Sequence, residues 1–252
     1  MNKMEKALSL NFFDECYSTN EFIKSEGNIS AMEEGESTLT TEEFIHNKII
    51  YQGSNLDELI NQFRDIRTAL SKQKSNNIIM ITSVDNNSGT SFFARNLAAV
   101  TAFDAYRTSL LVDCNIDNPS VATTFDLGGR KGLLDYVFDP ETREEDIIHS
   151  VGIKRFRSIT AGEMRLKNDE CFTHPKFRSL LFSLKSRYQD RSIFLDSPPL
   201  QKSADARILL DICDQVILVA PFGKVDAKKL ASISKLIPQG KLSGLVINDY
   251  IY

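Results

Sequence analysis

The short stretch VDNNSGTS carries the residue types of a phosphate-binding loop. Gly89 and Ser91 stand where a loop of the form G-x-x-x-x-G-K-[ST] has its second glycine and its magnesium-binding hydroxyl. In such a loop backbone N–H groups surround the phosphate oxygens, and the lysine reaches the β- and γ-phosphates. Here Val84 takes the place of the first glycine, Thr90 that of the lysine, and Asp85 adds a negative charge. By itself the stretch is equally compatible with a plain strand-to-helix connection.

Two aspartates follow apolar runs further along the chain. Asp113 ends TSLLVD, and Asp196 ends RSIFLD just before Ser197 and two prolines. A carboxylate in such a place can hold Mg²⁺ or act as a base, and the LDSPP turn has the form of a Walker B element. A single aspartate at a strand end is more often a cap or turn residue. The loop and the two aspartates in this order are far more specific for a nucleotide site.

These residues need a scaffold that brings them to one edge. Apolar runs of strand length occur at 77–82, 108–114, 156–160, 191–196, 215–220 and 243–248. Helices are predicted at 55–71, 90–105, 130–138, 142–149, 174–188, 203–211 and 225–236. This alternation predicts an α/β fold with a mostly parallel sheet and helices on both faces. Because ligands of such sheets bind at the carboxyl ends of the strands, the loops are expected to meet there.

The composition is that of an ordinary folded protein, with 42% hydrophobic and 25% charged residues among 252. A formal net charge of −4 argues against a general nucleic-acid binder. Residues 1–45 hold ten acidic and three basic side chains without sustained periodicity, so we expect an acidic, disordered tail. Within it, FFDECY is compatible with a short docking element, although an incidental apolar cluster is the preferred interpretation. Residues 46–252 are expected to form one domain.

The four cysteines show no C-x-x-C pairing, which argues against a disulfide framework or a zinc site. Cys114 and Cys213 lie in or beside apolar runs and are predicted to be buried thiols. No apolar stretch reaches 18 residues, and the amino-terminal ALSL is too short for a signal peptide. We therefore expect a cytoplasmic protein that reaches a membrane only through a partner.

Together these features resemble the bacterial tyrosine kinase (BY-kinase) family, P-loop domains of capsule and exopolysaccharide synthesis related to MinD/ParA-type ATPases. The resemblance runs from about Leu56 to Asn248. Besides the loop, it rests on FRDIRTAL, NLAAV, LLVDCNIDNPSV, GLLDYV, ITAGE, FRSLLFSLKSRY, IFLDSPPL, SADARIL and GLVIN. It implies nucleotide binding by Asn87, Ser88, Gly89, Thr90, Ser91 and Asn248, and Mg²⁺ binding by Ser91, Asp113 and Asp196. Asp113 and Asp196 would also be the catalytic carboxylates.

The resemblance also implies subunit contacts and phosphate acceptors. The family's E-x-x-R-x-x-R motif assembles its rings; Arg64 and Arg67 match the arginines, whereas Asn61 replaces the glutamate. Surface arginines without a partner are an equally good interpretation. The family's tyrosine cluster is reduced to Tyr250 and Tyr252, the remaining candidate acceptors.

Other departures fall on the catalytic motifs. The family's loop reads A-x-x-x-G-E-G-K-S, and its second motif is D-x-D-x-R, of which only Asp113 remains because Asn115 and Asp117 fill the other places. With Thr90 in place of the lysine, the resemblance implies a protein that has lost its catalytic activity. It also implies that ATP or ADP with Mg²⁺ binds only weakly. Whether the chain is an enzyme stays open at this point.

The first hypothesis is therefore a pseudo-kinase that binds a membrane polysaccharide co-polymerase or a catalytic paralogue at the inner face of the cell membrane. The second is an active, divergent tyrosine kinase or ATPase in which Lys202 or Arg95 replaces the lysine. A MinD/ParA-like positioning ATPase is disfavoured, because the loop has no lysine and the chain has no amphipathic carboxyl-terminal helix.

Overall fold

A computed structural model describes residues 39–72, 77–163 and 170–248, and these residues form an α/β fold around one seven-stranded sheet. The strands are β1 (Ile78–Ser83), β2 (Thr108–Asp113), β3 (His149–Ser150), β4 (Phe156–Ile159), β5 (Arg191–Asp196), β6 (Gln215–Pro221) and β7 (Leu242–Asn248). Their order is β3-β4-β2-β5-β1-β6-β7, and each pair is parallel except β3–β4. The predicted fold class is confirmed.

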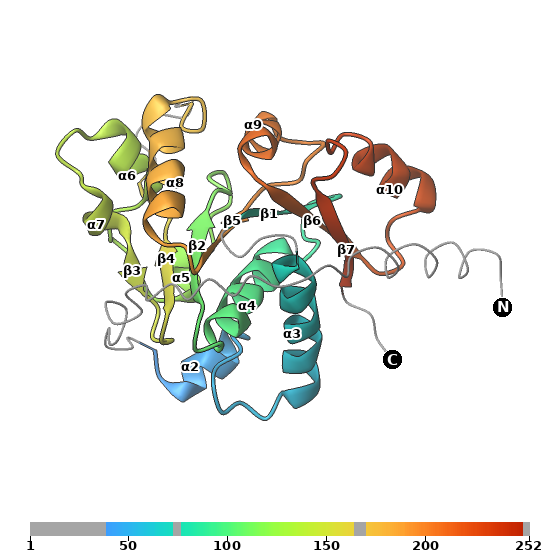
Figure 1. Cartoon of the computed structure of the whole chain (residues 1–252), viewed down its shortest axis with the longest axis horizontal. Helices are drawn as coiled ribbons and strands as arrows, with labels where there is room; N and C mark the ends of the chain where they lie inside the picture. The colour runs from blue at the N-terminus through green and yellow to red at the C-terminus, as the bar shows by residue number, and fades with distance from the viewer. Residues whose placement is uncertain (1–38, 73–76, 164–169, 249–252) are drawn as a thin grey trace.

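Helices cover both faces of the sheet (Figure 1). They are α2 (Thr41–His46), α3 (Asp57–Ser71), α4 (Thr90–Ala102), α5 (Val121–Thr124), α6 (Leu133–Phe138), α7 (Glu144–Ile147), α8 (Pro175–Arg187), α9 (Ala204–Ile212) and α10 (Ala227–Ser234). In Figure 1, α3 and α4 lie on one face, whereas α8, α9 and α10 lie on the other. No helix of the described residues is both long and apolar enough to cross a membrane.

Successive side chains of the central strands enter different cores, which explains their unbroken apolar sequence. On β1, Met80 packs in the core under α8 and α9, whereas Ile79 and Ile81 pack in the core under α3 and α4. Each such side chain contributes roughly 1.5–3 kcal/mol when it leaves water. Strands buried on both faces in this way give the loops at their carboxyl ends a rigid base.

The expectation of disorder for residues 1–45 is wrong for residues 39–45. Thr40 and Glu43 form a capping box that starts α2, and the side chains of Leu39 and Phe44 are buried in the core beneath α3 and α4. Ile49 and Ile50 join them and are almost fully buried. These apolar residues form no periodic pattern in the sequence, because they lie in one short helix and in the segments on either side of it. Residues 1–38 lie outside the described residues.

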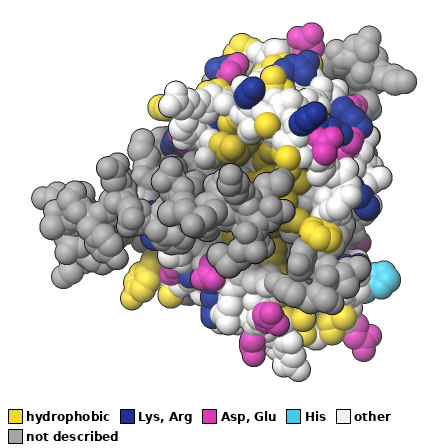
Figure 2. Space-filling view, turned by 90° about the vertical axis from the view of Figure 1, so that its right-hand side faces the viewer, with side chains coloured by type: hydrophobic (Ala, Val, Ile, Leu, Met, Phe, Trp, Pro, Cys, Tyr) yellow, Lys and Arg dark blue, Asp and Glu magenta, His cyan; other side chains and the backbone are white. Residues whose placement is uncertain are grey.

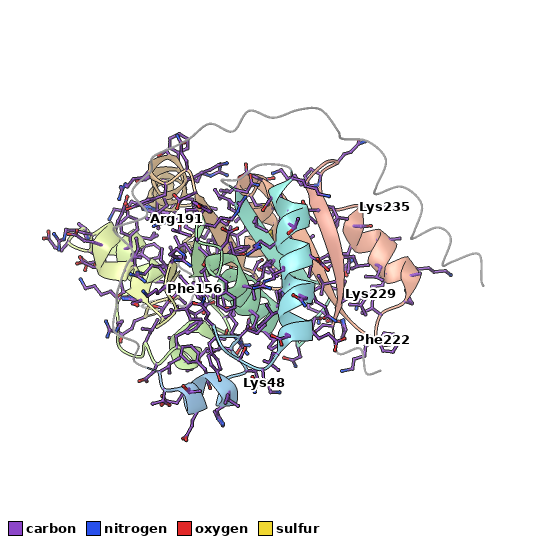
Figure 3. All side chains as sticks on the ribbon, turned by 60° about the horizontal axis from the view of Figure 1, so that its bottom comes forward. Lys48, Phe156, Arg191, Phe222, Lys229 and Lys235 are labelled. Carbon is purple, nitrogen blue, oxygen red and sulfur yellow. The ribbon has the colours of Figure 1, made fainter. Side chains whose placement is uncertain are left out.

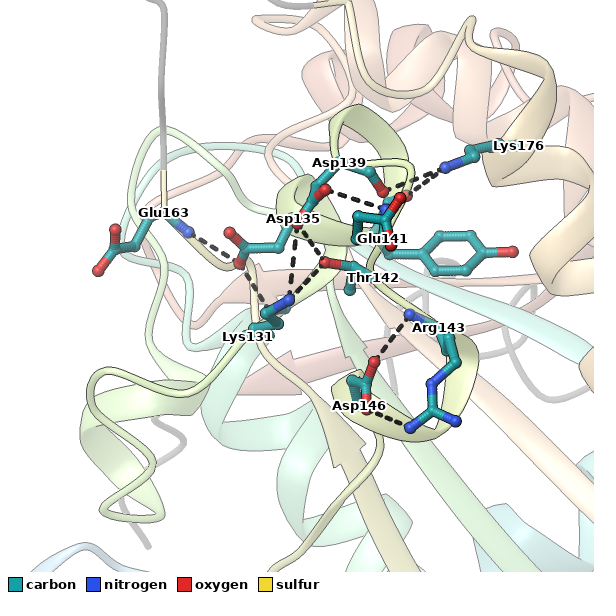
Figure 4. A network of polar contacts seen from close by, with 11 residues as sticks. Lys131, Asp135, Asp139, Glu141, Thr142, Arg143, Asp146, Glu163 and Lys176 are labelled. Carbon is teal, nitrogen blue, oxygen red and sulfur yellow. Dashed lines mark hydrogen bonds and ion pairs between the residues drawn. The ribbon is translucent and has the colours of Figure 1, made fainter.

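Beyond β4, a polar network ties α6 to its neighbours (Figure 4). The Asp135 carboxylate accepts backbone N–H bonds from Gly132 at 2.8 Å and from Glu163 at 3.4 Å. Lys176 of α8 donates to the carbonyl oxygen of Tyr136 at 3.1 Å. The GLLDYV segment is therefore fixed between the loop after β4 and α8, which extends the rigid base to this end of the sheet.

Candidate functional site

The loop between β1 and α4 keeps the folded-back shape of a phosphate-binding loop. Asn87 and Gly89 both have left-handed backbones, with φ of 56° and 84°. The Val84 N–H donates to the Val219 carbonyl at 3.2 Å, and the Ser88 hydroxyl donates to the Asp85 carbonyl at 2.7 Å. Left-handed residues next to a helix start turn backbone N–H groups toward one concavity, which suits an anion. The backbone of this loop is therefore compatible with the predicted phosphate site.

Asn248, the last residue of β7, closes over this loop. Its side-chain Nδ2 donates to the Ser88 carbonyl oxygen at 3.0 Å. A Cβ atom added to Gly89 would overlap this Nδ2 atom. The structure thus places Asn248 against the predicted nucleotide-binding residues, although it comes from the far end of the chain.

Gly89→Ala is expected to destabilise the protein by about 2–3 kcal/mol. A left-handed alanine costs roughly 1–2 kcal/mol. The new methyl group also displaces Asn248 and breaks a hydrogen bond worth about 1 kcal/mol. The matched control is Gly240→Ala, because Gly240 has a φ of 85° but open space around its Cβ position. Urea unfolding of both variants checks this, and equal losses would contradict the Asn248 contact.

Asp113 and Asp196 lie side by side at the carboxyl edge of the sheet. They end the neighbouring strands β2 and β5 and are Cα partners in the register. Both side chains are buried. Asp113 accepts backbone N–H bonds from Asn115 at 3.2 Å, Ser120 at 2.9 Å and Val121 at 2.9 Å. Neither carboxylate oxygen of Asp196 has a hydrogen-bond partner among the described residues.

The electrostatics of this pair favour a cation. Burial raises the pKa of Asp113, and burial together with the charge of Asp113 raises the pKa of Asp196. The nearby Ser91 hydroxyl and Arg95 guanidinium offset only part of the rise at Asp196. Buried carboxylate oxygens are ligands that Mg²⁺ prefers, so the residues fit the magnesium ion that the fold implies.

No group of three or more His, Cys, Asp and Glu side chains in the described ranges could hold a metal ion. A magnesium ion here would therefore rely on the Ser91 hydroxyl, on phosphate oxygens and on water besides the two aspartates. That ligand set is usual for Mg²⁺ in phosphate sites, where the protein supplies only one or two carboxylates.

Two lysines neutralise Asp85 at the mouth of the loop. Lys202, just before α9, and Lys229 of α10 both pair with its carboxylate, the latter at 2.6 Å. Hydrogen bonds from Lys202 and then Lys229 hold the pKa of Asp85 well below its usual range. We call Asp85, Lys202 and Lys229 the loop triad. Both cations of this triad lie beside the loop that lacks the lysine, and Asp85 already engages both.

The contact of Lys229 with the loop could not be predicted from local sequence. Lys229 lies 144 residues from Asp85, and nothing in the sequence of α10 marks it as facing the loop. Arg95, the other proposed substitute, donates to the Asn47 carbonyl at 3.2 Å and lies over the Phe92 ring. Arg95 is therefore held toward the segment that follows α2.

The predicted partner-contact arginines differ in position. Arg67 donates to the Val100 carbonyl of α4 at 3.2 Å, so its guanidinium is used within the molecule. Arg64 is exposed and donates to the Asn61 side chain at 3.5 Å. Tyr250 and Tyr252 lie outside the described residues.

The chain is similar in sequence to tyrosine-protein kinases of bacteria. It is 29% identical to tyrosine-protein kinase YwqD of Bacillus subtilis over 192 residues, which cover 74% of this chain and 79% of the relative. It is 27% identical over 190 residues to tyrosine-protein kinase CpsD of Streptococcus agalactiae, with coverage of 74% and 80%. No family model matches the chain.

Solved structures agree with the sequence comparison. The kinase domain of Escherichia coli tyrosine kinase ETK superposes with a TM-score of 0.68 and 26% identity, over 77% of this chain and 76% of that one. The cell division ATPase MinD of Pyrococcus furiosus shares the fold, with a TM-score of 0.57, 19% identity and coverage of 69% and 73%. This chain is a homologue of the bacterial tyrosine-protein kinases on the fold of the MinD-like P-loop ATPases.

Proposed function

We propose that this chain acts in capsule or exopolysaccharide synthesis as a nearly inactive relative of the bacterial tyrosine kinases, by binding rather than by phosphoryl transfer. One observation carries the proposal. Thr90 stands at the lysine position, and Asp85 engages both lysines that lie beside the loop. A phosphate group entering the loop would meet no free cation from these residues.

Phosphoryl transfer depends almost wholly on positioning and on stabilising negative charge. A lysine about 4 Å from a phosphate charge is worth up to roughly 4 kcal/mol at an effective dielectric constant near 20. The Thr90 hydroxyl can donate one neutral hydrogen bond, worth about 1 kcal/mol. Two further losses fall on the D-x-D-x-R motif. Asn115 stands in place of its second carboxylate, and Asp117 stands in place of its arginine. Together these losses are too large for efficient catalysis.

Weak nucleotide binding is part of the proposal. Ser91, Asp113 and Asp196 would hold Mg²⁺, and the residues from Asn87 to Ser91 would contact the phosphates beneath Asn248. A bound ATP would supply the γ-phosphoryl group and the metal would supply charge neutralisation. The backbone amides that open α4 still favour an anion.

The proposed partner is the cytoplasmic part of a membrane polysaccharide co-polymerase or a catalytic paralogue. This partner would recruit the chain to the inner face of the membrane. Arg64 stays exposed on α3, while Asn61 cannot return the carboxylate that a symmetric ring would need. A chain that keeps only one side of a reciprocal contact is better suited to binding a different subunit than to closing a ring of identical subunits.

The alternative function is an active, divergent tyrosine kinase that regulates polysaccharide polymerisation. The position of Lys202 and Lys229 favours it, since either lysine could turn from Asp85 to a phosphate. Tyr250 and Tyr252 would then be acceptor candidates.

The purified chain is expected to show no measurable autophosphorylation and an ATPase rate near background. The reason is the missing lysine charge at Thr90. Phosphotyrosine immunoblotting and phosphate release after incubation with Mg²⁺ and ATP check this, with an active relative such as YwqD as the positive control. Robust phosphotyrosine formation that Asp196→Ala abolishes would establish the alternative instead.

A further inference from the structure

Among the described residues, the outer edge of β7 pairs with no other strand, and the strand is apolar. In the strand order of the described residues β7 is the last strand, with β6 as its only neighbour. Its side chains Leu242, Leu245 and Ile247 are 36%, 42% and 44% exposed. Folded proteins normally protect such edges with charges, proline or a covering segment. The sequence LSGLVIN contains no charge and no proline, so this edge needs a covering segment.

Basic residues flank this edge. Residues 221–241, which include α10, hold five lysines and one aspartate. Lys229 belongs to the loop triad, and Lys241 donates to the Leu210 carbonyl at 2.8 Å, whereas Lys224, Lys228 and Lys235 are exposed. We call this surface the β7 face: Phe222, Lys224, Lys228, Lys235, Leu236, Leu242, Leu245 and Ile247.

Two residues of the β7 face, Phe222 and Lys235, are labelled in Figure 3 and lie on one side of the molecule. Phe222, Lys229 and Lys235 lie near α10 and the end of the sheet in Figure 3. Figure 2 views this side and shows hydrophobic side chains gathered with lysines and arginines beside them. Phe222 and Leu236 are 49% and 46% exposed, so the apolar character extends beyond the strand itself. The β7 face therefore suits a segment that is both apolar and acidic.

Charge decides between the candidate occupants. A second copy that paired β7 with β7 would bring its own Lys224, Lys228 and Lys235 against the same lysines, and like charges across an interface are unfavourable. Residues 1–38 have the opposite charge, with eight acidic and three basic side chains. They also carry the apolar stretch LSLNFF, which is followed at once by Asp14 and Glu15.

We propose that residues 1–38 of the same chain bind the β7 face, with residues 8–13 added as a strand along the outer edge of β7. Leu8, Leu10 and Phe12 alternate with other residues, so one face of the added strand is apolar and continues the surface of Leu245 and Ile247. The acidic side chains that follow meet the exposed lysines. This intramolecular contact goes beyond the proposed function and does not depend on it.

The covalent connection permits this arrangement. The chain enters the described fold at Leu39, and the 25 residues between Phe13 and Leu39 span up to roughly 80 Å when extended. A domain of this size has a radius of gyration of about 18 Å, so every surface is within reach. An intramolecular segment also has an effective concentration in the millimolar range, which favours it over a free copy.

Cys16 provides a direct test in the full chain. It lies next to the acidic pair, whereas Cys114, Cys171 and Cys213 are buried, so a maleimide benzophenone label attaches to Cys16 in the folded protein. After irradiation, mass spectrometry is expected to find crosslinks from Cys16 to residues 222–247 of the same molecule. Leu10→Asp in the segment, and Lys224→Glu, Lys228→Glu and Lys235→Glu together, are each expected to reduce them at least fivefold.

The matched control is Arg130→Glu, Lys154→Glu and Arg178→Glu, which makes the same charge change at exposed positions in α8 and in the segments before α6 and β4, toward the opposite end of the strand order from β7. It is expected to leave the crosslinks within twofold. Crosslinks that are absent, that fall elsewhere, or that respond equally to both triple variants would overturn the proposal. Crosslinks only between two molecules would also overturn it and would assign the β7 face to a second copy.

Discussion

Replacing Thr90 by lysine is expected to strengthen ATP binding by about 10- to 100-fold. The substitution returns a positive charge to a loop whose backbone still has the left-handed turns of a phosphate site. The full Coulomb gain of up to about 4 kcal/mol is reduced by solvent screening. Calorimetric titration with ATP in the presence of Mg²⁺ measures the change.

Thr68→Lys is the control for the change in net charge, because Thr68 is exposed on α3. It should leave ATP affinity unchanged. Autophosphorylation should stay near background in Thr90→Lys, since Asn115 and Asp117 still replace the second and third motif residues. An unchanged ATP affinity in Thr90→Lys would show that the loop does not bind phosphate in the proposed manner.

Asp196→Asn is expected to raise the free energy of unfolding by about 1–3 kcal/mol at pH 8 without Mg²⁺. The reason is that Asp196 is a buried carboxylate beside Asp113, and the nearby Ser91 hydroxyl and Arg95 guanidinium offset only part of the resulting rise in its pKa. An ionised group of this kind costs at least as much as an unsatisfied polar group, and the amide removes its charge at almost the same volume.

The sign of the pH dependence follows from the raised pKa of Asp196. A carboxyl group whose pKa is higher in the folded than in the unfolded protein stabilises the fold below the unfolded pKa. That contribution is lost as the pH rises through the folded pKa. The advantage of Asp196→Asn should therefore be larger at pH 8 than at pH 5. Urea unfolding at both pH values measures it, and an advantage that shrinks with rising pH would contradict this reasoning.

Asp113→Asn is the informative comparison for that experiment. Asp113 is buried too, but three backbone N–H groups donate to its two oxygens. An asparagine keeps only one acceptor oxygen and turns an NH₂ group toward the remaining donors. The gain from removing the charge is therefore offset, and Asp113→Asn should be less stable than Asp196→Asn.

The strands and the meeting of their loops could be predicted because local sequence determines both. A strand buried on two faces must be apolar at consecutive positions, as TSLLVD and RSIFLD are. Parallel strands then bring their carboxyl ends to one edge, which places Asp113 beside Asp196. The burial of Cys114 and Cys213 followed from the same apolar runs and is confirmed.

Contacts between distant side chains could not be predicted. Lys229 reaches Asp85 because α10 packs against a particular part of the sheet, and neither helix periodicity nor strand alternation encodes that rotation. The same holds for Asn248, whose amide reaches the Ser88 carbonyl from 160 residues away. α2 was missed for a different reason: a six-residue helix shows fewer than two turns of its apolar pattern.

The loop triad bears on how the chain could change in evolution. The negatively charged Asp85 forms ion pairs with Lys202 and Lys229 beside the loop between β1 and α4. Aspartate and asparagine codons differ by a single nucleotide, so one point mutation would leave two cations facing the loop without any change in the fold. A lysine at position 90 would not be needed for the loop to gain positive charge. A search for natural variants of this chain that bind nucleotides more tightly should therefore begin with substitutions at residue 85.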